Sequence, residues 1–374
     1  MKKPLGVAIA GVGFIGQVHV RAARAAGAEV IGVAGLNAQR TRATADAVQV
    51  ECVYTSPEEL ASDPNVDVVH ICTPNNTHAS LARLALSNGK HVICEKPLAT
   101  SVDAAASIAN QAREAGLLAA VPFVYRFHPM VLEARHRVAH QLGALRLVHG
   151  SYQQDWLASP DSSSWRVDPK IGGPSQAFAD IGSHWCDLVE FVTGHRIVRL
   201  NAKTHTTVRE RNADSTEAFS RSDSTERVEV HGDDAITMMF ETDNGAHGTL
   251  LISQVSWGRK NRLFFELDGA NEAISFNQEE SEHLWIGKRD ATEMLWRDPH
   301  CLSPQAAHYA TLPAGHAQGF ESCFDAFVAD AYAAIKGSVS DVLPLFSDGL
   351  RAAQITQTVL DSAKSETWKE VPKS

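Results

Sequence analysis

The sequence predicts an α/β protein. We expect an N-terminal Rossmann domain with a doubly wound parallel sheet, then a C-terminal α+β domain with a large open, mostly antiparallel sheet. Over about the first 125 residues, short continuous apolar runs alternate with helical patterns, which is typical of strands buried on both faces. Beyond residue 140 the apolar residues alternate singly between turns, which is typical of antiparallel strands. The predicted domains are 1–126 and 127–374, and the C-terminal helix could pack back on the first domain.

The composition is that of an ordinary globular chain with room for two domains. Its 374 residues are 44% hydrophobic and 21% charged, with a formal net charge of -10. A negative chain is poorly suited to sequence-independent binding of nucleic acid or of an anionic membrane surface. No stretch approaches the roughly 20 apolar residues of a membrane helix. We therefore expect neither nucleic acid nor membrane as a partner.

The cysteines and the first residues indicate a reducing cytoplasm. Six cysteines are scattered without a CxxC pair, so neither a zinc site nor a disulfide framework is expected. The histidines form no metal-like set either, and no metal is predicted. The start MKKPLGVAIAGVGFIG superficially resembles a signal peptide, but glycines interrupt its apolar run and no small-residue cleavage site follows.

The first apolar run leads straight into a glycine-rich turn and then a helical pattern. The turn reads Gly11-Val12-Gly13-Phe14-Ile15-Gly16. Strand, GxGxxG and helix in this order are the dinucleotide fingerprint in its required context. Gly11 permits the tight turn, Gly13 lets the backbone approach a pyrophosphate, and Gly16 lets helix and strand pack closely. The pyrophosphate would rest on the N-terminus of the helix.

The end of the second strand, 29–34, leaves the choice between NAD and NADP open. NAD-binding folds usually place Asp or Glu there to accept a hydrogen bond from the ribose 2′-hydroxyl. This chain has Gly35-Leu36-Asn37-Ala38-Gln39-Arg40 instead. Asn37 could bond a ribose hydroxyl and Arg40 could reach a 2′-phosphate. Leu36 stands where a phosphate-binding arginine often lies, so NAD is favoured and NADP is not excluded.

Two further strands deliver polar loops to the carboxyl edge of the sheet. Strand 66–71 precedes Thr73-Pro74-Asn75-Asn76-Thr77-His78, and strand 91–94 precedes Glu95-Lys96-Pro97. Ligands of such folds bind at this edge, so His78 could touch a cofactor through its loop. Lys96 could face the cofactor crevice or be a solvated surface lysine, and the residues alone leave both interpretations open.

The second domain contains a predicted helix whose start carries a carboxylate and an imidazole. Within 172–191, apolar residues recur at helical spacing, Asp180 stands at the expected N-cap, and Gly194 stands at the expected stop. His184 follows Asp180 by four residues and should lie on the same side of the first turn. Such a pair can share a proton and orient each other. Simple capping by Asp180 and packing by His184 would explain the same pattern.

The remaining alternating segments predict the antiparallel sheet. Asp243-Asn244-Gly245 predicts a hairpin turn, and 209–227, rich in Ser, Thr, Glu and Asp, predicts a solvated loop. The predicted strands are 145–154, 197–206, 227–229, 235–241, 248–255, 263–267 and 272–276. Two helices, near 317–336 and 348–362, are expected to close the chain.

In their fixed order, GVGFIG, TPNNTH, EKP and GG…DIGSH resemble the Gfo/Idh/MocA oxidoreductases over nearly the whole chain. The resemblance implies Lys96, Asp180 and His184 as a catalytic set, and Thr73, Asn75 and Glu95 as neighbours of the cofactor. Trp165-Arg166 matches a pair found near the nicotinamide in some members. The C-terminal sheet of the family often mediates oligomerisation, which implies a homodimer or homotetramer. The missing acid at Gly35 is the clear departure.

Within the family, SYQQDW, WRVD and GHAQGF look most like bacterial sugar and cyclitol dehydrogenases. This implies oxidation of a secondary ring hydroxyl of a sugar, anhydrosugar or cyclitol, with C3 of a pyranose favoured. The hydride would go to nicotinamide C4, with His184 as base, Asp180 orienting it, and Lys96 bonding the reacting oxygen. Two rival functions are glycoside cleavage through a transient 3-keto sugar with bound NAD, and a non-enzymatic cofactor-sensing regulator. A regulator would not need all three residues.

Recognition of a polyol needs several directed polar groups. Further substrate candidates beside the catalytic set are Tyr125, Arg126, Gln154, Asp155 and His316. Each has a plainer interpretation: the first two could be contacts at the domain junction, the next two could face water, and His316 could cap a helix or lie on the surface.

Overall fold

The computed structural model describes residues 3–212, 220–221 and 226–373. Its contacts divide the chain into two compact units. The first unit comprises Met1–Pro122, Lys170–Gly173 and Phe324–Ala353. The second unit comprises Phe123–Pro169, Pro174–Cys323 and Gln354–Ser374. The domain limits 1–126 and 127–374 stay a proposal. The first unit differs from the predicted first domain in that it also includes the distant segments Lys170–Gly173 and Phe324–Ala353.

The first unit is built on a parallel six-stranded sheet in the order β3-β2-β1-β4-β5-β6. Its strands are β1 Gly6–Ala10, β2 Glu29–Ala34, β3 Cys52–Tyr54, β4 Val68–Ile71, β5 His91–Cys94 and β6 Ala119–Ala120. Every residue of β1 and β4 is buried, as the continuous apolar runs predict. The strand order reverses between β1 and β4, which is where such folds open a crevice for a ligand.

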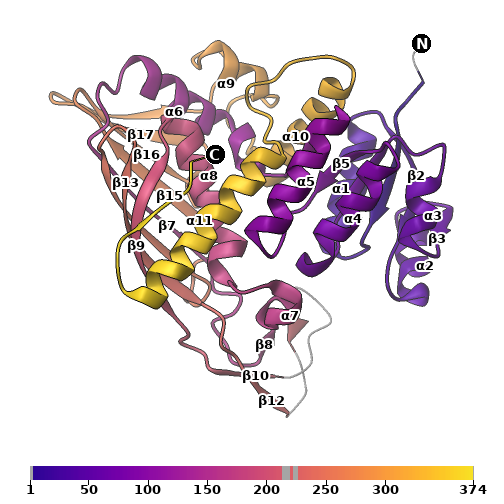
Figure 1. Cartoon of the computed structure of the whole chain (residues 1–374). Helices are drawn as coiled ribbons and strands as arrows, with labels where there is room; N and C mark the ends of the chain where they lie inside the picture. The colour runs from indigo at the N-terminus through magenta and orange to yellow at the C-terminus, as the bar shows by residue number, and fades with distance from the viewer. Residues whose placement is uncertain (1–2, 213–219, 222–225, 374) are drawn as a thin grey trace. The chain divides into compact units, whose positions relative to one another are not determined.

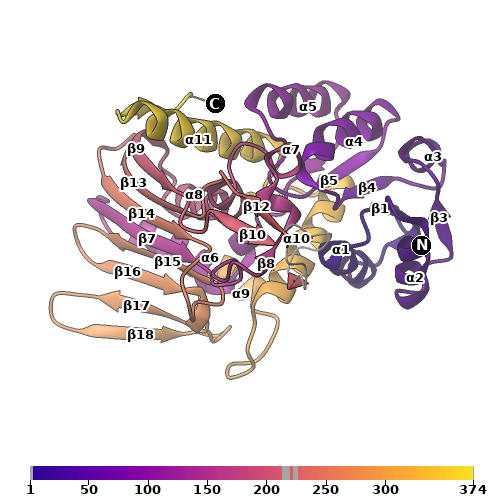
Figure 2. The ribbon, with the colours of Figure 1, turned by 90° about the horizontal axis from the view of Figure 1, so that it is seen from below.

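Helices cover both faces of this sheet (Figure 2), with α4 and α5 on one side and α1 on the other. The helices between its strands are α1 Phe14–Ala25, α2 Ala38–Ala47, α3 Pro57–Ser62, α4 Asn75–Ser87 and α5 Val102–Ala115. The doubly wound sheet predicted from the sequence is confirmed. Strand β6, at one edge of the sheet, has only two residues.

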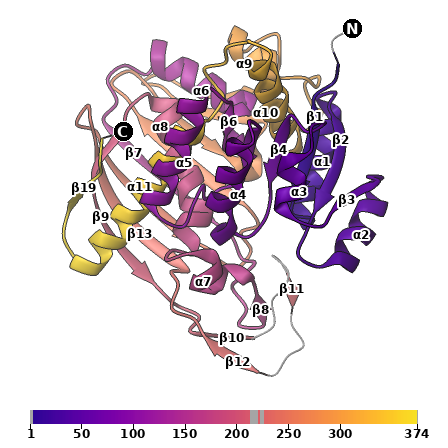
Figure 3. The same ribbon diagram turned by 45° about the vertical axis from the view of Figure 1, so that its right-hand side comes forward.

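The second unit is built on a nine-stranded sheet in the order β18-β17-β16-β15-β7-β14-β13-β9-β19, most of which can be followed in Figure 2. Its strands are β7 Leu147–Gln153, β9 Ile197–His205, β13 Ala235–Thr242, β14 His247–Ser253, β15 Arg262–Asp268, β16 Ala273–Asn277, β17 His283–Gly287, β18 Thr292–Trp296 and β19 Lys369–Glu370. Neighbouring strands are antiparallel except β7 and β14, which run parallel. Figure 3 shows the short β19 beside β9 at one edge. The sheet is therefore mixed but mostly antiparallel, as predicted.

One face of this sheet is covered by helix α8, Ser183–Thr193, together with α6, Pro129–His140 (Figure 1). Trp185 of α8 is fully buried and donates its indole N–H to the carbonyl of Phe264 at 2.8 Å. Gly150 makes this approach possible, because a Cβ there would lie 2.6 Å from the indole nitrogen. Exposure alternates along β13 and β14, so the opposite face is open.

Shorter elements complete the chain. They are the 3-10 turns Val124–Phe127, Trp165–Val167 and Gln278–Glu280, the strands β8 Ser162–Ser163, β10 Glu210–Asn212, β11 Ser220–Arg221 and β12 Arg227–Glu229, and the helices α7 Pro169–Gly172, α9 Pro304–Tyr309, α10 Phe320–Ile335 and α11 Phe346–Ser365. The two closing helices were predicted to within three residues at each end.

The structure corrects the prediction that Asp180 is an N-cap. Asp180 lies inside a π-helical turn, Phe178–Gly182, which continues without a break into α8. The buried carboxylate of Asp233 caps this segment instead, accepting from the backbone N–H groups of Gln176 at 2.8 Å and Phe178 at 2.9 Å. The C-terminal stop was predicted correctly, because Gly194 adopts the left-handed conformation there, with φ of 69°.

The prediction of a solvated loop over 209–227 is wrong for its first residues. Residues Glu210–Asn212 form β10, which pairs with β12. Arg211 is fully buried and donates to the carbonyls of Leu157 and Ser159 at 2.7 and 2.9 Å. The strand was missed because its residues are polar, and a sequence pattern cannot show that an arginine is buried against backbone carbonyls. The parts of this loop at 213–219 and 222–225 lie outside the described residues.

Candidate active site

The glycine-rich turn between β1 and α1 has the geometry of a dinucleotide cradle. Gly11 has φ of +108°, and a Cβ there would lie 2.4 Å from the carbonyl oxygen of Cys72. A Cβ on Gly16 would lie 2.0 Å from the carbonyl oxygen of Gly11. A Cβ on Gly13 would instead meet nothing within 4 Å, and Gly13 starts α1 without a side-chain cap. Open space at an uncapped helix N-terminus fits a diphosphate, and Phe14 and Ile15 begin that helix.

After β2, close packing at Gly35 leaves no room for the acidic side chain that usually binds the ribose. A Cβ on Gly35 would lie 2.4 Å from the hydroxyl of Thr41, which donates to the carbonyl of Asn37. The Asn37 side chain caps α2, because its oxygen accepts from the N–H of Arg40 at 2.9 Å. Leu36 and the Arg40 side chain are exposed. Carboxylates are thus absent from 35–40, and position 35 has no room for one without displacing Thr41.

His78 ties together the loops that follow β4 and β5. Its ring nitrogens lie 2.7 Å from the carbonyl oxygen of Pro97 and 2.8 Å from that of Thr73. Burial lowers the pKa of His78, while the two carbonyls act against that shift by favouring the protonated ring. The hydroxyls of Thr73 and Thr77 also bond each other at 2.6 Å. His78 therefore fixes the edge of the sheet where Lys96 lies.

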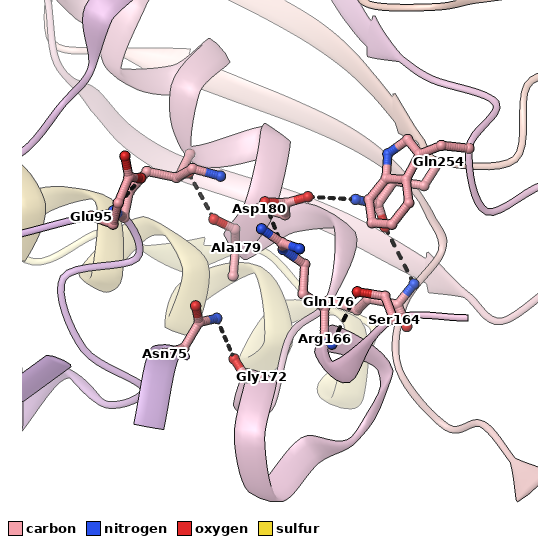
Figure 4. A network of polar contacts seen from close by, with 12 residues as sticks. Asn75, Glu95, Ser164, Arg166, Gly172, Gln176, Ala179, Asp180 and Gln254 are labelled. Atoms are coloured by element: carbon pink, nitrogen blue, oxygen red, sulfur yellow. Dashed lines mark hydrogen bonds and ion pairs between the residues drawn. The ribbon is translucent and has the colours of Figure 1, made fainter. Parts of the chain in front are cut away.

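The same loop holds the segment 170–173. The amide of buried Asn75 donates to the carbonyl of Gly172 at 2.8 Å (Figure 4), and that of Asn76 donates to the carbonyl of Lys170 at 3.1 Å. Gly173, with φ of +100°, passes close to the side chain of Thr100. Asn75 thus positions backbone at the carboxyl edge of the parallel sheet.

Glu95 is a buried carboxylate immediately before Lys96. One oxygen lies 3.1 Å from Nε2 of His19, and the other accepts from the backbone N–H of Lys96 at 3.2 Å. Burial acts to raise the pKa of Glu95, but the hydrogen bond from His19 and the nearby Lys96 hold it below its ordinary value. Glu95 is therefore an anion fixed to the peptide of Lys96.

In the second unit, the carboxylate of Asp180 contacts the side chains of Gln254 and Arg166. Gln254, fully buried, donates to one carboxylate oxygen at 2.8 Å, and Nε of Arg166 lies 3.5 Å from the other (Figure 4). Gln176 donates in turn to Gln254 at 3.3 Å. The Arg166 guanidinium stacks 4.4 Å from the ring centre of Trp165. This places the predicted Trp165-Arg166 pair beside Asp180.

The imidazole of His184 lies among aromatic rings. Its centre is 5.2 Å from that of Tyr125, 5.5 Å from Phe123 and 6.5 Å from Tyr152, and the residue is buried. Asp180 and His184 were predicted to orient each other, and that relation stays a prediction. The second unit therefore surrounds the imidazole of His184 with aromatic rings, two of which are the phenol rings of Tyr125 and Tyr152.

A chain of polar side chains continues from those phenols. Asn261 is its centre: it accepts from Tyr152 at 2.7 Å and from Gln154 at 2.8 Å, and donates to Tyr125 at 3.2 Å. Trp156 donates to Gln154 at 2.6 Å. Burial raises the pKa of both tyrosines, so both keep their protons. The motif SYQQDW contains Tyr152, Gln154 and Trp156, but nothing in the sequence links Asn261 to it.

Other predicted substrate residues are engaged elsewhere. Arg126 forms a buried ion pair with Asp187, with Nε 2.8 Å from the carboxylate. Asp155 accepts from Lys260 at 2.6 Å, and this hydrogen bond lowers the pKa of Asp155. The side chain of His316 is exposed, and the backbone carbonyl of His316 accepts a hydrogen bond from Arg297. Their contact with substrate stays a prediction.

Metal-binding groups come together at one place in the described part of the chain. His149, Glu266 and Asp268, neighbours across β7 and β15, bring ligand atoms within 4.8 Å of one another. They are half-buried or exposed on the sheet, and the sequence could not align them because the strands are far apart along the chain. All six cysteines are free thiols. Within the described residues, no helix combines the length and apolar character required to span a bilayer.

Comparison with known proteins identifies both parts of the chain. Residues 5–123 match the oxidoreductase family model with an NAD-binding Rossmann fold, and residues 131–275 match the GFO/IDH/MocA C-terminal domain. The chain belongs to the Gfo/Idh/MocA oxidoreductases. It is 32% identical over 328 residues to levoglucosan dehydrogenase of Pseudarthrobacter phenanthrenivorans, covering 84% of this chain and 82% of that protein. It is 25% identical to scyllo-inositol 2-dehydrogenase (NAD(+)) of Bacillus subtilis, covering 76% and 78%.

Solved structures of oxidoreductases have the same fold. A levoglucosan dehydrogenase in complex with NADH and L-sorbose superposes with a TM-score of 0.90 at 28% identity, covering 100% of both chains. An oxidoreductase domain protein from Kribbella flavida superposes with a TM-score of 0.89 at 32% identity, covering 99% and 100%. The predicted family, its fold, its oxidoreductase class and its NAD-binding Rossmann domain are confirmed, and the family includes sugar and cyclitol dehydrogenases.

Proposed function

We propose that this oxidoreductase oxidises a secondary ring hydroxyl of a sugar, anhydrosugar or cyclitol to the ketone, with C3 of a pyranose favoured and His184 as the base. The proposal is supported chiefly by the second unit, where His184 lies beside the hydrogen-bonded set Tyr125, Tyr152, Asn261 and Gln154. Recognition of a polyol needs several directed donors and acceptors around one reacting group. The names of the relatives, levoglucosan and inositol dehydrogenases, agree with this substrate class.

Oxidation of a secondary alcohol removes a proton from oxygen and a hydride from carbon. A bound nicotinamide supplies the acceptor for the hydride at C4. The imidazole of His184 takes the hydroxyl proton, since an ordinary imidazole titrates near pH ~6.5. The anionic Asp180, held by Gln254 and Arg166, stabilises the imidazolium that forms. Lys96 donates a hydrogen bond to the reacting oxygen and stabilises its negative charge.

The coenzyme is proposed to be NAD rather than NADP. An exposed Leu36 and a packed Gly35 provide no charged clamp for a 2′-phosphate directly after β2. Asn37 and Arg40 are the remaining candidates for contact with the ribose. We also propose a homodimer or homotetramer in the cytoplasm, assembled through the open face of the large sheet, where Met239, Leu251 and Leu147 are exposed.

A substrate screen tests the proposal. Monosaccharides, anhydrosugars and inositols are offered with NAD and with NADP, and formation of the reduced nicotinamide is followed by its absorbance. The position of the new ketone is then read by carbon NMR. Reduced nicotinamide should accumulate with at least one free polyol, faster with NAD. Failure with every polyol, or turnover of glycosides without net reduction of added coenzyme, would overturn the proposed reaction.

The proposed residues are tested on the best substrate. His184→Ala and Lys96→Ala should each lower kcat by about 10²–10⁴-fold, the usual contribution of an acid–base group. His247→Ala is the matched control, because His247 lies exposed on β14. Near wild-type turnover by His184→Ala would remove His184 from its role as base.

A further inference from the structure

A buried row of polar side chains in the first unit leads away from Glu95 into the core. The ring of His19 on α1 lies between Glu95 and the ring of His70 on β4, with Nδ1 of the two histidines 2.8 Å apart. Nε2 of His70 lies 2.9 Å from the hydroxyl of Tyr332 on α10. His19 and His70 are fully buried and Tyr332 is 2% exposed. The proposed chemistry uses neither histidine and does not use Tyr332.

The proton positions in this row can be deduced from its two ends. Among the described residues, the Tyr332 hydroxyl has one hydrogen-bond partner, His70, so its proton must point there or remain buried without an acceptor. Nε2 of His70 is then an acceptor, and a neutral His70 carries its proton on Nδ1. That proton faces Nδ1 of His19, which must accept it, so a neutral His19 carries its proton on Nε2, toward Glu95.

We infer that Tyr332, His70 and His19 form a hydrogen-bond chain that runs in one direction to Glu95, and that this chain holds the Glu95 carboxylate against the peptide N–H of Lys96. His19 is thereby a positioning residue for the Glu95–Lys96 end of the proposed dehydrogenase site. Each polar atom that the chain uses has a partner, and Glu95 is the only charge within it. The opposite direction would leave the Tyr332 proton unsatisfied and would aim a lone pair of His19 at an anion.

The surroundings of the chain agree with this assignment. Burial lowers the pKa of His70 well below its usual value and raises that of Tyr332, so the first is neutral and the second keeps its proton. The edge of the His19 ring packs on Phe324, with centres 4.8 Å apart. In the described part of the chain, the titratable groups near Glu95 include His19, His78, Lys96, Cys72 and Cys94. Of these, His19 is the one that bonds the carboxylate from another element of the fold.

Nitrogen NMR of ¹⁵N-histidine-labelled protein tests the direction without any turnover. The two resonance pairs are assigned by their loss in His19→Gln and His70→Asn. Between pH 6 and 8, His70 should show a protonated Nδ1 and a bare Nε2, and His19 should show a bare Nδ1 and a protonated Nε2. An imidazolium at His19, or a proton on Nε2 of His70, would overturn the inference. This result is independent of whether the proposed reaction is correct.

The positioning role, which rests on the proposed function, is tested by the pH dependence of NADH affinity, read by nicotinamide fluorescence. His19→Leu removes the donor to Glu95, and because a hydrogen bond to a charged group is strong, the acid limb should move up by about one to two pH units. His19→Gln, which returns an N–H to that place, should restore most of the shift. His91→Leu is the matched control, since His91 loses a bond from the Leu118 N–H without touching Glu95.

Tyr332→Phe provides a milder variant that keeps the packing if His19→Leu does not fold. Without the hydroxyl, His70 is free to move its proton to Nε2, and the nitrogen spectrum should show a mixture of tautomers at both histidines. Unchanged tautomers in Tyr332→Phe, or an acid limb in His19→Leu that matches that of His91→Leu, would refute the chain as a positioning device. Absence of NADH binding by the wild-type protein would refute the proposed function and leave the NMR result standing.

Discussion

Replacing Gln254 by leucine isolates the support that Asp180 receives. Gln254 is fully buried, and its amide donates to the carboxylate at 2.8 Å while its oxygen accepts from Gln176 at 3.3 Å. Leucine has a similar volume but no donor, so Asp180 keeps Arg166, at 3.5 Å, as its cation. A hydrogen bond to a charged group contributes about 1.5–3 kcal/mol. If Asp180 stabilises charge that develops in the transition state, kcat/KM should fall by roughly 10- to 150-fold.

The assay is steady-state oxidation of the best polyol at saturating NAD, with thermal unfolding measured in parallel. Thr242→Val serves as the control, because buried Thr242 in the same unit also loses side-chain hydrogen bonds, here to the hairpin at Ala246. Both variants should unfold at somewhat lower temperatures, and only Gln254→Leu should lose activity. A folded Gln254→Leu whose kcat/KM stays within about twofold of wild type would refute the role given to Asp180.

Three further perturbations follow from the packing and the buried charges. Gly16→Ala should abolish NADH binding in a fluorescence titration, because its Cβ would lie 2.0 Å from the carbonyl of Gly11 and push the turn out of place; binding within threefold of wild type would contradict the cradle. Gly150→Ala should lower stability by about 1–3 kcal/mol, since its Cβ would lie 2.6 Å from the Trp185 indole nitrogen; unchanged unfolding in urea would contradict the tight packing. Burial lowers the pKa of His128 to about 4. Its ring is therefore neutral in the folded chain but protonated in the unfolded chain between about pH 4 and the ordinary histidine pKa of about 6.5. The unfolding temperature should fall as pH decreases through this range, and His128→Asn should flatten that dependence.

The parallel half of the fold was predictable because its signals are local. Strand β5 has the predicted bounds, and the three glycines after β1 lie within six residues, where a Cβ on Gly16 would meet the carbonyl of Gly11. Strand β18 was missed because nearly all of its residues are exposed, so it lacks the alternating apolar pattern of a half-buried strand. Strand β17 was missed although its burial alternates over five residues. Asp180 was misread as a cap because the π-helical turn and its true cap, Asp233, are invisible in the local sequence.

The candidate site could be predicted only where a motif carried it. Lys96, Asp180 and His184 follow from short motifs, whereas their partners come from distant strands and loops. Gln254 reaches Asp180 across 74 residues, and Asn261 reaches Tyr152 across 109. Periodicity and spacing describe one element at a time. They cannot show which buried amide a second element will present to a carboxylate.

The first unit includes the segment Phe324–Ala353 from near the end of the chain, and this affects how the unit can fold during translation. Val121, just beyond β6, donates to the carbonyl of Pro344 at 3.1 Å, and Asp325 pairs with Arg21 of α1 at 2.8 Å. On a ribosome, N-terminal domains generally fold first. Here the nucleotide-binding sheet cannot close its outer edge until roughly the last tenth of the chain is being made. The nascent protein must therefore keep that edge unpaired for most of translation, when chaperones have the longest access to it.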